Sequence, residues 1–304
     1  MHLNGAYPII RSFGLPTVCT FHATSFVQLR SGFYSLNSIR TVEDISLFLL
    51  KNPAGILSDF LSARVSDRII CPSPSIASEL QSHCFVKGEK IQVIPNGLDL
   101  KTINEVKTID ASFLEKSGIV KDKFVLFIGR LVFVKGVNYL IEAFKLVHEE
   151  YPDLKLVIVG DGPSMPYLRS ISRDLDSVFF LGRIISPKVK SLLYKNCLAV
   201  VVPSIQDTLP TVVLEAMMHN KPVVATSVGG IPFMVKNGEN GFIVAPKDIR
   251  SLSLSISTLY RNPELSKTMG ANGKEIVATK FSSEVMVTET LRVYEKLLTA
   301  TDLT

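Results

Sequence analysis

The stretch VVVPSIQDTLPTVVLEAMMHNKPVVATSVGG, residues 200–230, decides the fold class of this chain. The apolar run Leu198–Val202 overlaps its start and predicts a buried strand. A helix is predicted from near Pro210, because proline suits a first helical turn, and it ends before Pro222. A second apolar strand follows at Val223–Thr226. Strand, loop, helix and strand make one right-handed βαβ unit, which indicates a parallel sheet.

Two carboxylates flank the start of this predicted helix. Asp207 lies in the loop just before it, and Glu215 lies one to two turns inside it. In a βαβ unit that loop and the helix N-terminus lie at the carboxyl edge of the sheet, where free N–H groups and the helix dipole favour an anion. Carboxylates there would accept hydrogen bonds from sugar or ribose hydroxyls. A solvated loop aspartate and a helix-surface glutamate explain the same pattern, so both interpretations stay open.

The rest of the chain predicts two α/β domains. Residues 100–121 are polar and lack a clear period, which places a boundary there. After the boundary, short apolar runs alternate with helical patterns, which is typical of a parallel, doubly wound sheet. The expected strands are 123–128, 154–159 and 178–181, and the expected helices are 136–150, 164–174, 187–196, 248–261, 263–279 and 283–298. Before the boundary, the helical apolar spacing of residues 23–62 is broken by Gly32, Pro53 and Gly55.

Composition excludes several classes of protein. The chain has 304 residues, of which 46% are hydrophobic, yet its longest apolar runs are too short to span a bilayer. The net charge of +5 is spread out, which argues against nucleic-acid binding and suits anionic small molecules or a weak contact with a membrane surface. The four cysteines form no CxxC pair, so buried free thiols in a reducing cytoplasm are expected at Cys19, Cys71, Cys84 and Cys197.

A basic, glycine-containing loop follows the strand predicted at 123–128. Gly129-Arg130 begins it and Lys135-Gly136 leads into a helix. Glycines let the backbone approach a ligand, and the two cations can reach phosphate oxygens from two sides. Two surface cations would explain the same residues, but cations are disfavoured at a helix N-terminus. The pattern therefore favours an anionic ligand.

Other candidate motifs are weaker. The turn after the second predicted strand, Gly160-Asp161-Gly162, has Met165 where a dinucleotide fingerprint needs its third glycine, which argues against NAD. Asp174 and Asp176 match a metal-binding DxD pattern, but three residues in a charged turn match by chance often, so we expect no metal site. His22 closes a predicted strand at the carboxyl edge, where a catalytic role competes with an ordinary structural one.

Six motifs together resemble a known family. They are His22 after a strand, VIPNGLD at 93–99, Gly129-Arg130 with Lys135-Gly136, VGDGP at 159–163, FLG at 180–182, and Asp207 to Glu215. In order and spacing they are similar to family 4 of the retaining glycosyltransferases (glycosyl transferases group 1), which have the GT-B fold. The resemblance implies two Rossmann-like α/β domains with parallel sheets. It predicts a partial, acceptor-side N-terminal domain at 1–104, a nucleotide-sugar domain at 105–280, and a last helix at 281–304 that packs back on the first domain.

The resemblance also implies roles for single residues. Arg130 and Lys135 would neutralise a donor diphosphate, and Glu215 would hold the ribose hydroxyls. Asp207 would contact the transferred sugar, and His22 would reach toward the reaction centre. The implied catalytic residues are His22, Arg130, Lys135 and Asp207, and the implied donor-binding residues are Gly129, Arg130, Lys135, Gly182, Arg183, Ile184, Asp207, Thr208, Leu209, Pro210, Thr211 and Glu215.

The expected activity is retaining transfer of a hexose from a nucleotide diphosphate sugar to a hydroxyl of a glycan or a lipid-linked glycan. The resemblance implies no metal and no cofactor, and a cytoplasmic protein, with the cytoplasmic membrane face as one option. Asp207 is a methylene shorter than the family's glutamate, and Phe233 stands where an acid is common. The family's N-terminal domain normally begins with further strands, so we expect a misassigned start, a partner chain that supplies them, or lost catalysis. A non-catalytic or partner-dependent nucleotide-sugar-binding subunit, or a truncated remnant, is the open alternative.

Overall fold

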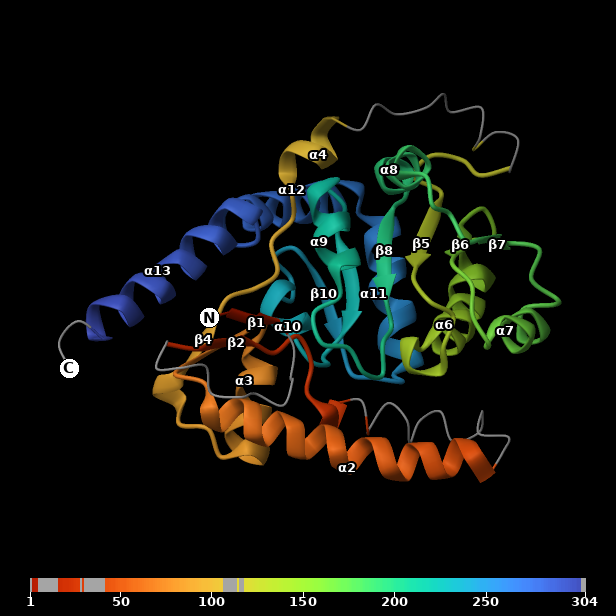
Figure 1. Cartoon of the computed structure of the whole chain (residues 1–304). Coiled ribbons are helices and arrows are strands. Elements are labelled where there is room, and N and C mark those ends of the chain that lie inside the picture. The colour runs from red at the N-terminus through yellow and green to blue at the C-terminus, as the bar shows by residue number, and fades with distance from the viewer. Residues whose placement is uncertain are drawn as a thin grey trace. The chain divides into compact units, whose positions relative to one another are not determined.

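The computed structural model of this protein describes residues 2–4, 16–27, 29, 42–105, 114 and 118–301. These residues fall into two compact units. Unit 1 comprises the described residues up to Gly97 and those from Ser283 onward, and unit 2 comprises those within Leu98–Ser282. Each unit has helices packed around a fully parallel sheet (Figure 1). The two parallel sheets confirm the predicted α/β class.

Unit 2 is built on six strands in the order β10-β9-β8-β5-β6-β7. The strands are β5 (Phe124–Ile128), β6 (Lys155–Val159), β7 (Val178–Gly182), β8 (Ala199–Val202), β9 (Val223–Thr226) and β10 (Gly241–Val244). From β5 the chain adds β6 and β7 on one side, then crosses back to add β8, β9 and β10 on the other. The order therefore reverses between β5 and β8, and in open α/β sheets ligands bind outside the carboxyl ends of the strands at such a switch point.

Helices cover both faces of the unit 2 sheet because successive strand residues point to opposite faces. In β5, Phe124 and Leu126 pack on one face with residues of α8 and α9, whereas Val125 and Phe127 pack on the other with residues of α6 and α11. All four side chains are buried. The helical segments are α4 (Leu100–Glu105), η3 (Phe133–Lys135), α6 (Val137–Glu150), α7 (Met165–Ile171), α8 (Pro187–Asn196), α9 (Thr211–Met218), α10 (Ile231–Met234), α11 (Ile249–Arg261) and α12 (Pro263–Lys280).

Unit 1 contains a four-stranded sheet in the order β1-β2-β3-β4 within the residues that the structure describes. Its strands are β1 (His2–Asn4), β2 (Val18–Thr20), β3 (Arg68–Cys71) and β4 (Ile91–Val93). Its helical segments are α2 (Val42–Val65), α3 (Pro74–Cys84), η2 (Gly88–Lys90) and α13 (Ser283–Thr301). Val293 and Leu297 of α13 pack against Val18, Ile70 and Ile94. The last helix therefore completes the core of unit 1 although it is the end of the chain.

Helix α2 corrects one sequence expectation. The break expected at Pro53 and Gly55 does not occur, because α2 continues through both residues; Gly32 lies outside the described residues. A Cβ atom at Gly55 would lie 2.7 Å from Ser25 Oγ, so the missing side chain lets residue 25 approach the helix closely. The backbone N–H of Ser25 also donates to Asp59 Oδ2 of the same helix at 2.6 Å. Tertiary contact therefore explains a residue that local propensity reads as a breaker.

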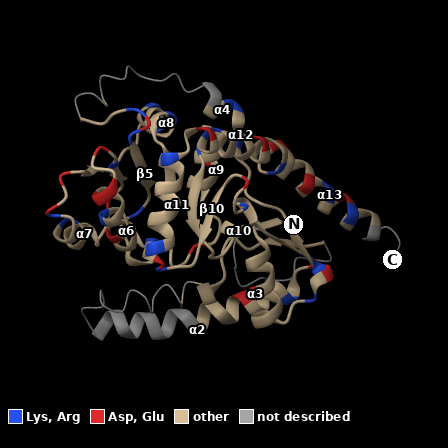
Figure 2. Ribbon diagram, turned by 180° about the vertical axis from the view of Figure 1, so that it is seen from behind, with Lys and Arg blue, Asp and Glu red and all other residues tan. Residues whose placement is uncertain are grey.

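The cysteines are buried, whereas charged side chains of both signs lie along the last two helices. All four cysteines are free and buried, as predicted. No helix within the described ranges is long and apolar enough to cross a membrane. Lys and Arg are interspersed with Asp and Glu along α12 and along α13 (Figure 2).

Candidate functional site

A cavity of about 530 Å³ opens at the carboxyl ends of β5, β6 and β7, and we call it the strand-end cavity. Arg130 follows β5, Arg183 follows β7, and Lys190 comes from the first half of α8. The lining is Ile128, Gly129, Arg130, Val159, Gly160, Asp161, Gly162, Arg183, Ile184 and Lys190. Three cations and one carboxylate thus share one cavity, which suits a ligand with more than one negative charge.

Close backbone packing forms the floor of this cavity. Gly129 N–H donates to Val159 O at 3.0 Å, and Gly160 N–H donates to Gly182 O at 2.8 Å, so the sheet ladder continues past the strand ends. Gly160 has φ +140°, and a Cβ atom there would lie 1.8 Å from Gly129 O. Only glycine fits at this point. The predicted glycines therefore bring backbone, rather than side chains, to the cavity.

Lys135 and Asp207 meet at the switch point of the sheet. Lys135 ends the loop after β5, Asp207 lies in the loop after β8, and the Lys135 Nζ to Asp207 Oδ2 distance is 2.7 Å. The side chains are 24% and 9% exposed, so this pair is largely shielded from water. Ser204 Oγ also donates to Asp207 Oδ2 at 3.1 Å, and Thr208 N–H donates to Asp207 Oδ1 at 3.1 Å. The two residues were predicted to contact phosphate and sugar, and the structure joins them to each other.

The loop that carries Asp207 is held from both sides. On the β5 side, Ile205 N–H donates to Val134 O at 2.8 Å. On the β9 side, Thr226 Oγ1 donates to Ser204 O at 2.5 Å, and Gly230 N–H donates to Thr208 O at 2.6 Å. These bonds fix the position of Asp207 ahead of α9.

The other predicted residues of this loop divide between the core and the surface. Leu209 and Pro210 are buried, Thr208 is half-buried and Thr211 is exposed. Helix α9 begins at Thr211 without a side-chain cap, so the N–H groups of its first turn include donors that the helix itself does not use. These donors lie just beyond the loop that holds Asp207.

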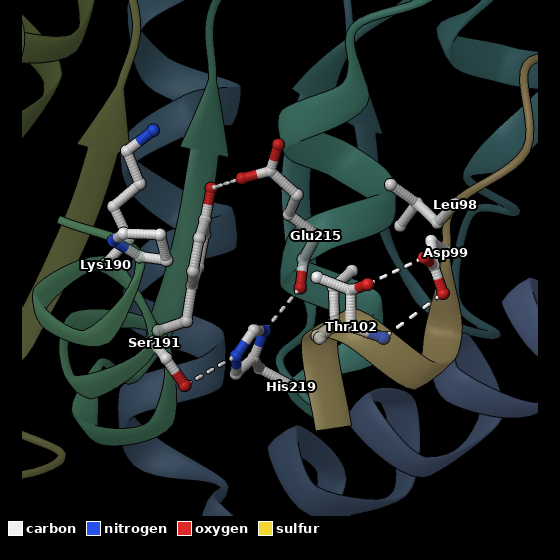
Figure 3. A pocket seen from close by; sticks show the side chains of 10 residues that line it. Leu98, Asp99, Thr102, Lys190, Ser191, Glu215 and His219 are labelled. Carbon is white, nitrogen blue, oxygen red and sulfur yellow. Dashed lines mark hydrogen bonds between the residues drawn. The ribbon is translucent and has the colours of Figure 1, made fainter. Parts of the chain in front are cut away.

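A second cavity, of about 370 Å³, lies between α4, α8 and α9 (Figure 3), and we call it the inter-helix cavity. Its lining is Leu98, Asp99, Thr102, Ile103, Pro187, Lys190, Ser191, Tyr194, Glu215 and His219. Lys190 lines both cavities. In Figure 3 the Lys190 ammonium and the Glu215 carboxylate point toward the same end of this cavity. A molecule with a charged part and a hydroxyl-bearing part could therefore extend from one cavity to the other.

Glu215 is held by hydroxyl groups on both of its carboxylate oxygens. Tyr194 OH donates to Glu215 Oε2 at 2.9 Å, and Thr211 Oγ1 donates to Glu215 Oε1 at 3.4 Å. Tyr194 is 1% exposed. Burial, together with the neighbouring Glu215 charge, raises the pKa of Tyr194 well above its ordinary value. The phenol therefore stays protonated and remains a donor.

His219 ties α9 to α8. Its Nδ1 lies 2.8 Å from Glu215 O and its Nε2 lies 3.0 Å from Ser191 Oγ (Figure 3). The carbonyl can only accept, so Nδ1 carries the proton and Nε2 accepts from the serine. The ring stacks on Tyr194 with centroids 5.0 Å apart. Burial lowers the pKa of His219 below its ordinary value, which favours this neutral form.

His22 lies in unit 1, beside a cavity of about 410 Å³. His22 Nε2 is 2.6 Å from Asn4 Oδ1, and both residues follow or end strands at the carboxyl edge of the unit 1 sheet. The cavity is lined by His2, Asn4, Thr20, His22, Ile70, Ile94, Asn96, Met286, Val287, Thr290, Leu291 and Tyr294. Polar groups from the sheet edge and from α13 therefore surround His22 within its own unit.

Several residues of these cavities were not predicted from the sequence. Lys190 and Tyr194 lie on α8, which has the pattern of an ordinary amphipathic helix, and His219 directly follows α9. Asp161 was interpreted as part of a tight turn. Asp174 and Asp176 are exposed and precede β7, at the amino edge of the sheet and opposite the strand-end cavity. No group of three or more metal-ligating side chains occurs among the described residues.

Two family models match this chain. The model for glycosyl transferases group 1 matches residues 111–276, and the model for glycosyltransferase family 4 matches residues 1–102. Two uncharacterized glycosyltransferases of Methanocaldococcus jannaschii are each 33% identical over 78% and 86% of this chain. The chain spans 62% and 69% of their lengths.

Solved structures share the fold. Sucrose-phosphate synthase from Thermosynechococcus elongatus superposes with a TM-score of 0.74 at 24% identity, over 95% of this chain and 70% of that chain. Anabaena HepE in complex with UDP-glucose superposes with a TM-score of 0.72 at 24% identity, over 93% of this chain and 72% of that chain. Together with the two matching models, these similarities show that the chain belongs to the glycosyl transferases group 1 family, family 4 of the glycosyltransferases, with the GT-B fold.

Proposed function

We propose that this protein transfers a hexose from a nucleotide diphosphate sugar to a hydroxyl of a glycan or lipid-linked glycan, with retention of the anomeric configuration. The observation that carries the proposal is the strand-end cavity, where Arg130, Arg183 and Lys190 surround a glycine backbone and adjoin the cavity of Glu215. A nucleoside diphosphate has the matching parts, two phosphates followed by a ribose. The relative Anabaena HepE has been solved with UDP-glucose, which supports a donor of this class.

The donor would lie across the two cavities. Its diphosphate would sit in the strand-end cavity, where guanidinium and ammonium groups neutralise it. Glu215 would accept from the ribose hydroxyls, because an ionised carboxylate has more acceptor positions than Tyr194 and Thr211 occupy. Gly182 ends β7, Arg183 and Ile184 follow it, and the three would face the base.

Lys135 and Asp207 would act where the glycosidic bond breaks. The Lys135 ammonium has three N–H donors and Asp207 uses one, so two remain for the departing diphosphate. Charge develops on that diphosphate in the transition state, and a fixed cation there lowers the barrier. Asp207 would contact a hydroxyl of the transferred sugar. The bond from the anomeric carbon to the phosphate oxygen breaks, a bond to the acceptor oxygen forms on the same face, and the acceptor proton passes to the diphosphate.

We further propose that transfer requires no metal. The cations of the strand-end cavity can neutralise the diphosphate, and Asp174 and Asp176 precede β7 at the opposite edge of the sheet. His22 would serve the acceptor side from unit 1, next to the cavity that it lines. Four free, buried thiols suit a reducing compartment, so we place the protein in the cytoplasm.

Calorimetric titration with UDP-glucose, GDP-mannose and ADP-glucose, with and without EDTA, tests the proposal. We expect micromolar binding of one donor, unchanged by EDTA and weakened at least about tenfold by Arg130→Ala, since a charge-assisted hydrogen bond is lost. Asp153→Ala is the matched control, because it also removes one charged side chain, and Asp153, which pairs with Lys123, lines neither cavity. Absence of binding by the folded chain would refute the donor site. Binding without sugar transfer to any glycan or lipid-linked acceptor would favour a non-catalytic binding subunit.

A further inference from the structure

Tyr194 is fully inside the core, yet it donates a hydrogen bond to the one carboxylate that lines the inter-helix cavity from α9. Its side chain is 1% exposed and packs among the buried residues of unit 2. Its hydroxyl lies 2.9 Å from Glu215 Oε2. A buried phenol needs an acceptor, and a tyrosine packed in the core cannot move away from the acceptor that it binds. The contact therefore also fixes the position of the Glu215 carboxylate.

The geometry points to Tyr194 as a positioning residue that aims the Glu215 carboxylate at the ribose of the nucleotide, and so sets preference for ribose over its deoxy forms. This inference rests on the proposed function, because it takes the nucleotide donor as given. Glutamate has three rotatable side-chain bonds. With Tyr194 on Oε2 and Thr211 on Oε1, both oxygens are held before any ligand arrives. Preorganised acceptors lose less freedom when they bind.

A second set of contacts fixes Tyr194 relative to Glu215. His219 bridges Ser191 of α8 and the Glu215 carbonyl of α9, with contacts of 3.0 Å and 2.8 Å. Its ring stacks on the Tyr194 ring at an interplanar angle of 23°. Helix α8 is therefore joined to α9 on the same face that carries the phenol. The distance between the phenol and the carboxylate depends on this junction.

The test is the affinity of Tyr194→Phe for a ribonucleotide and for its analogue without ribose hydroxyls. The probes are UDP, GDP or ADP, whichever the wild type binds best, and the matching 2′,3′-dideoxynucleoside diphosphate. We expect about tenfold weaker binding of the ribonucleotide and less than about twofold change for the dideoxy analogue, as for one lost hydrogen bond to a charged group. A merely structural role would weaken both equally. The control is Tyr260→Phe, because the Tyr260 hydroxyl donates to Asp153 and lines neither cavity.

Two further variants test whether Tyr194 acts through Glu215 and through the junction of α8 with α9. In a Glu215→Ala background, Tyr194→Phe should change ribonucleotide affinity by less than about twofold, because the contact through which it acts is absent. Ser191→Ala leaves the phenol in place and loosens the junction, so it should weaken the ribonucleotide alone, by about two- to threefold, even where Tyr194→Phe fails to fold.

The outcomes separate this inference from the proposed function. A wild-type chain that binds no nucleoside diphosphate overturns both. A wild type that prefers the ribonucleotide, with Tyr194→Phe retaining the full preference, overturns the positioning role alone. Equal loss for both nucleotides in Tyr194→Phe overturns it as well.

Discussion

Removal of the Asp207 carboxylate tests how the switch point is held together. In Asp207→Ala, three donors lose their acceptor: Lys135 Nζ, Ser204 Oγ and Thr208 N–H. Removing one partner of a buried ion pair costs about 3–5 kcal/mol, and an unpaired buried donor costs about 1–3 kcal/mol. The Lys135 side chain is 24% exposed, so water recovers part of this loss. We expect the free energy of unfolding to fall by about 3 kcal/mol.

Urea titration followed by circular dichroism measures this change. Glu142→Ala is the matched control, because Glu142 pairs with Lys145 at 2.8 Å but the side chains are 40% and 38% exposed. An exposed helix pair contributes about 0.5 kcal/mol or less, so the control should leave the unfolding transition nearly unchanged. If Asp207→Ala is as stable as the control, Asp207 does not hold the loop and the reasoning about the switch point fails.

Three further predictions concern the same unit. Gly136→Ala places a Cβ atom 2.0 Å from Pro203 O at φ +67° and should lower the free energy of unfolding by about 3 kcal/mol or more. Gly118→Ala, at φ +66° with no atom within 4 Å, should lower it by about 1 kcal/mol. Equal thermal melting points of the two variants would contradict this. Burial lowers the pKa of His219 below 6.5, so protonation favours the unfolded chain and the free energy of unfolding should fall as the pH drops below 6.5. In urea titrations, His219→Gln should lose less of this free energy than the wild type between about pH 7.5 and pH 5.5. An equal loss would rule His219 out as a contributor. Lys135→Ala should reduce turnover about a hundredfold and donor affinity by less than about tenfold, because a residue that stabilises the leaving diphosphate acts mainly in the transition state. Initial rates measure the turnover and calorimetry measures the affinity. Equal losses in both would indicate plain ground-state binding.

The central βαβ unit was predictable from the sequence because its signals are local. The apolar run before Pro203 became β8, and the run Val223–Thr226 became β9 with the predicted bounds. The helix between them begins at Thr211, one residue after the proline that marked its start. The period of the apolar residues, the length of each apolar run and the position of the prolines are all defined by neighbouring residues, so they can be read directly from the sequence.

The contacts between elements were not predictable in the same way. Lys190 and Tyr194 lie in a helix whose pattern shows only an apolar face, and nothing in it indicates that Glu215, on another helix, meets the phenol. The pairing of Lys135 with Asp207 follows from the strand order, which places the loops after β5 and β8 side by side. Gly55 was misread because the reason for a glycine in α2 is the approach of residue 25. Each case depends on residues far apart in the chain.

Hydrogen–deuterium exchange of the whole chain, with and without its preferred nucleotide sugar, tests the central claim most directly. We predict slower exchange in three peptides, residues 129–136, 183–194 and 203–215, because these carry Arg130, Lys190 and Glu215 of the two cavities and the Lys135–Asp207 pair. Peptides of α11 and α12 should exchange at unchanged rates and serve as internal references. Protection that avoids the three peptides while the donor is bound would contradict a donor site at the carboxyl edge of this sheet.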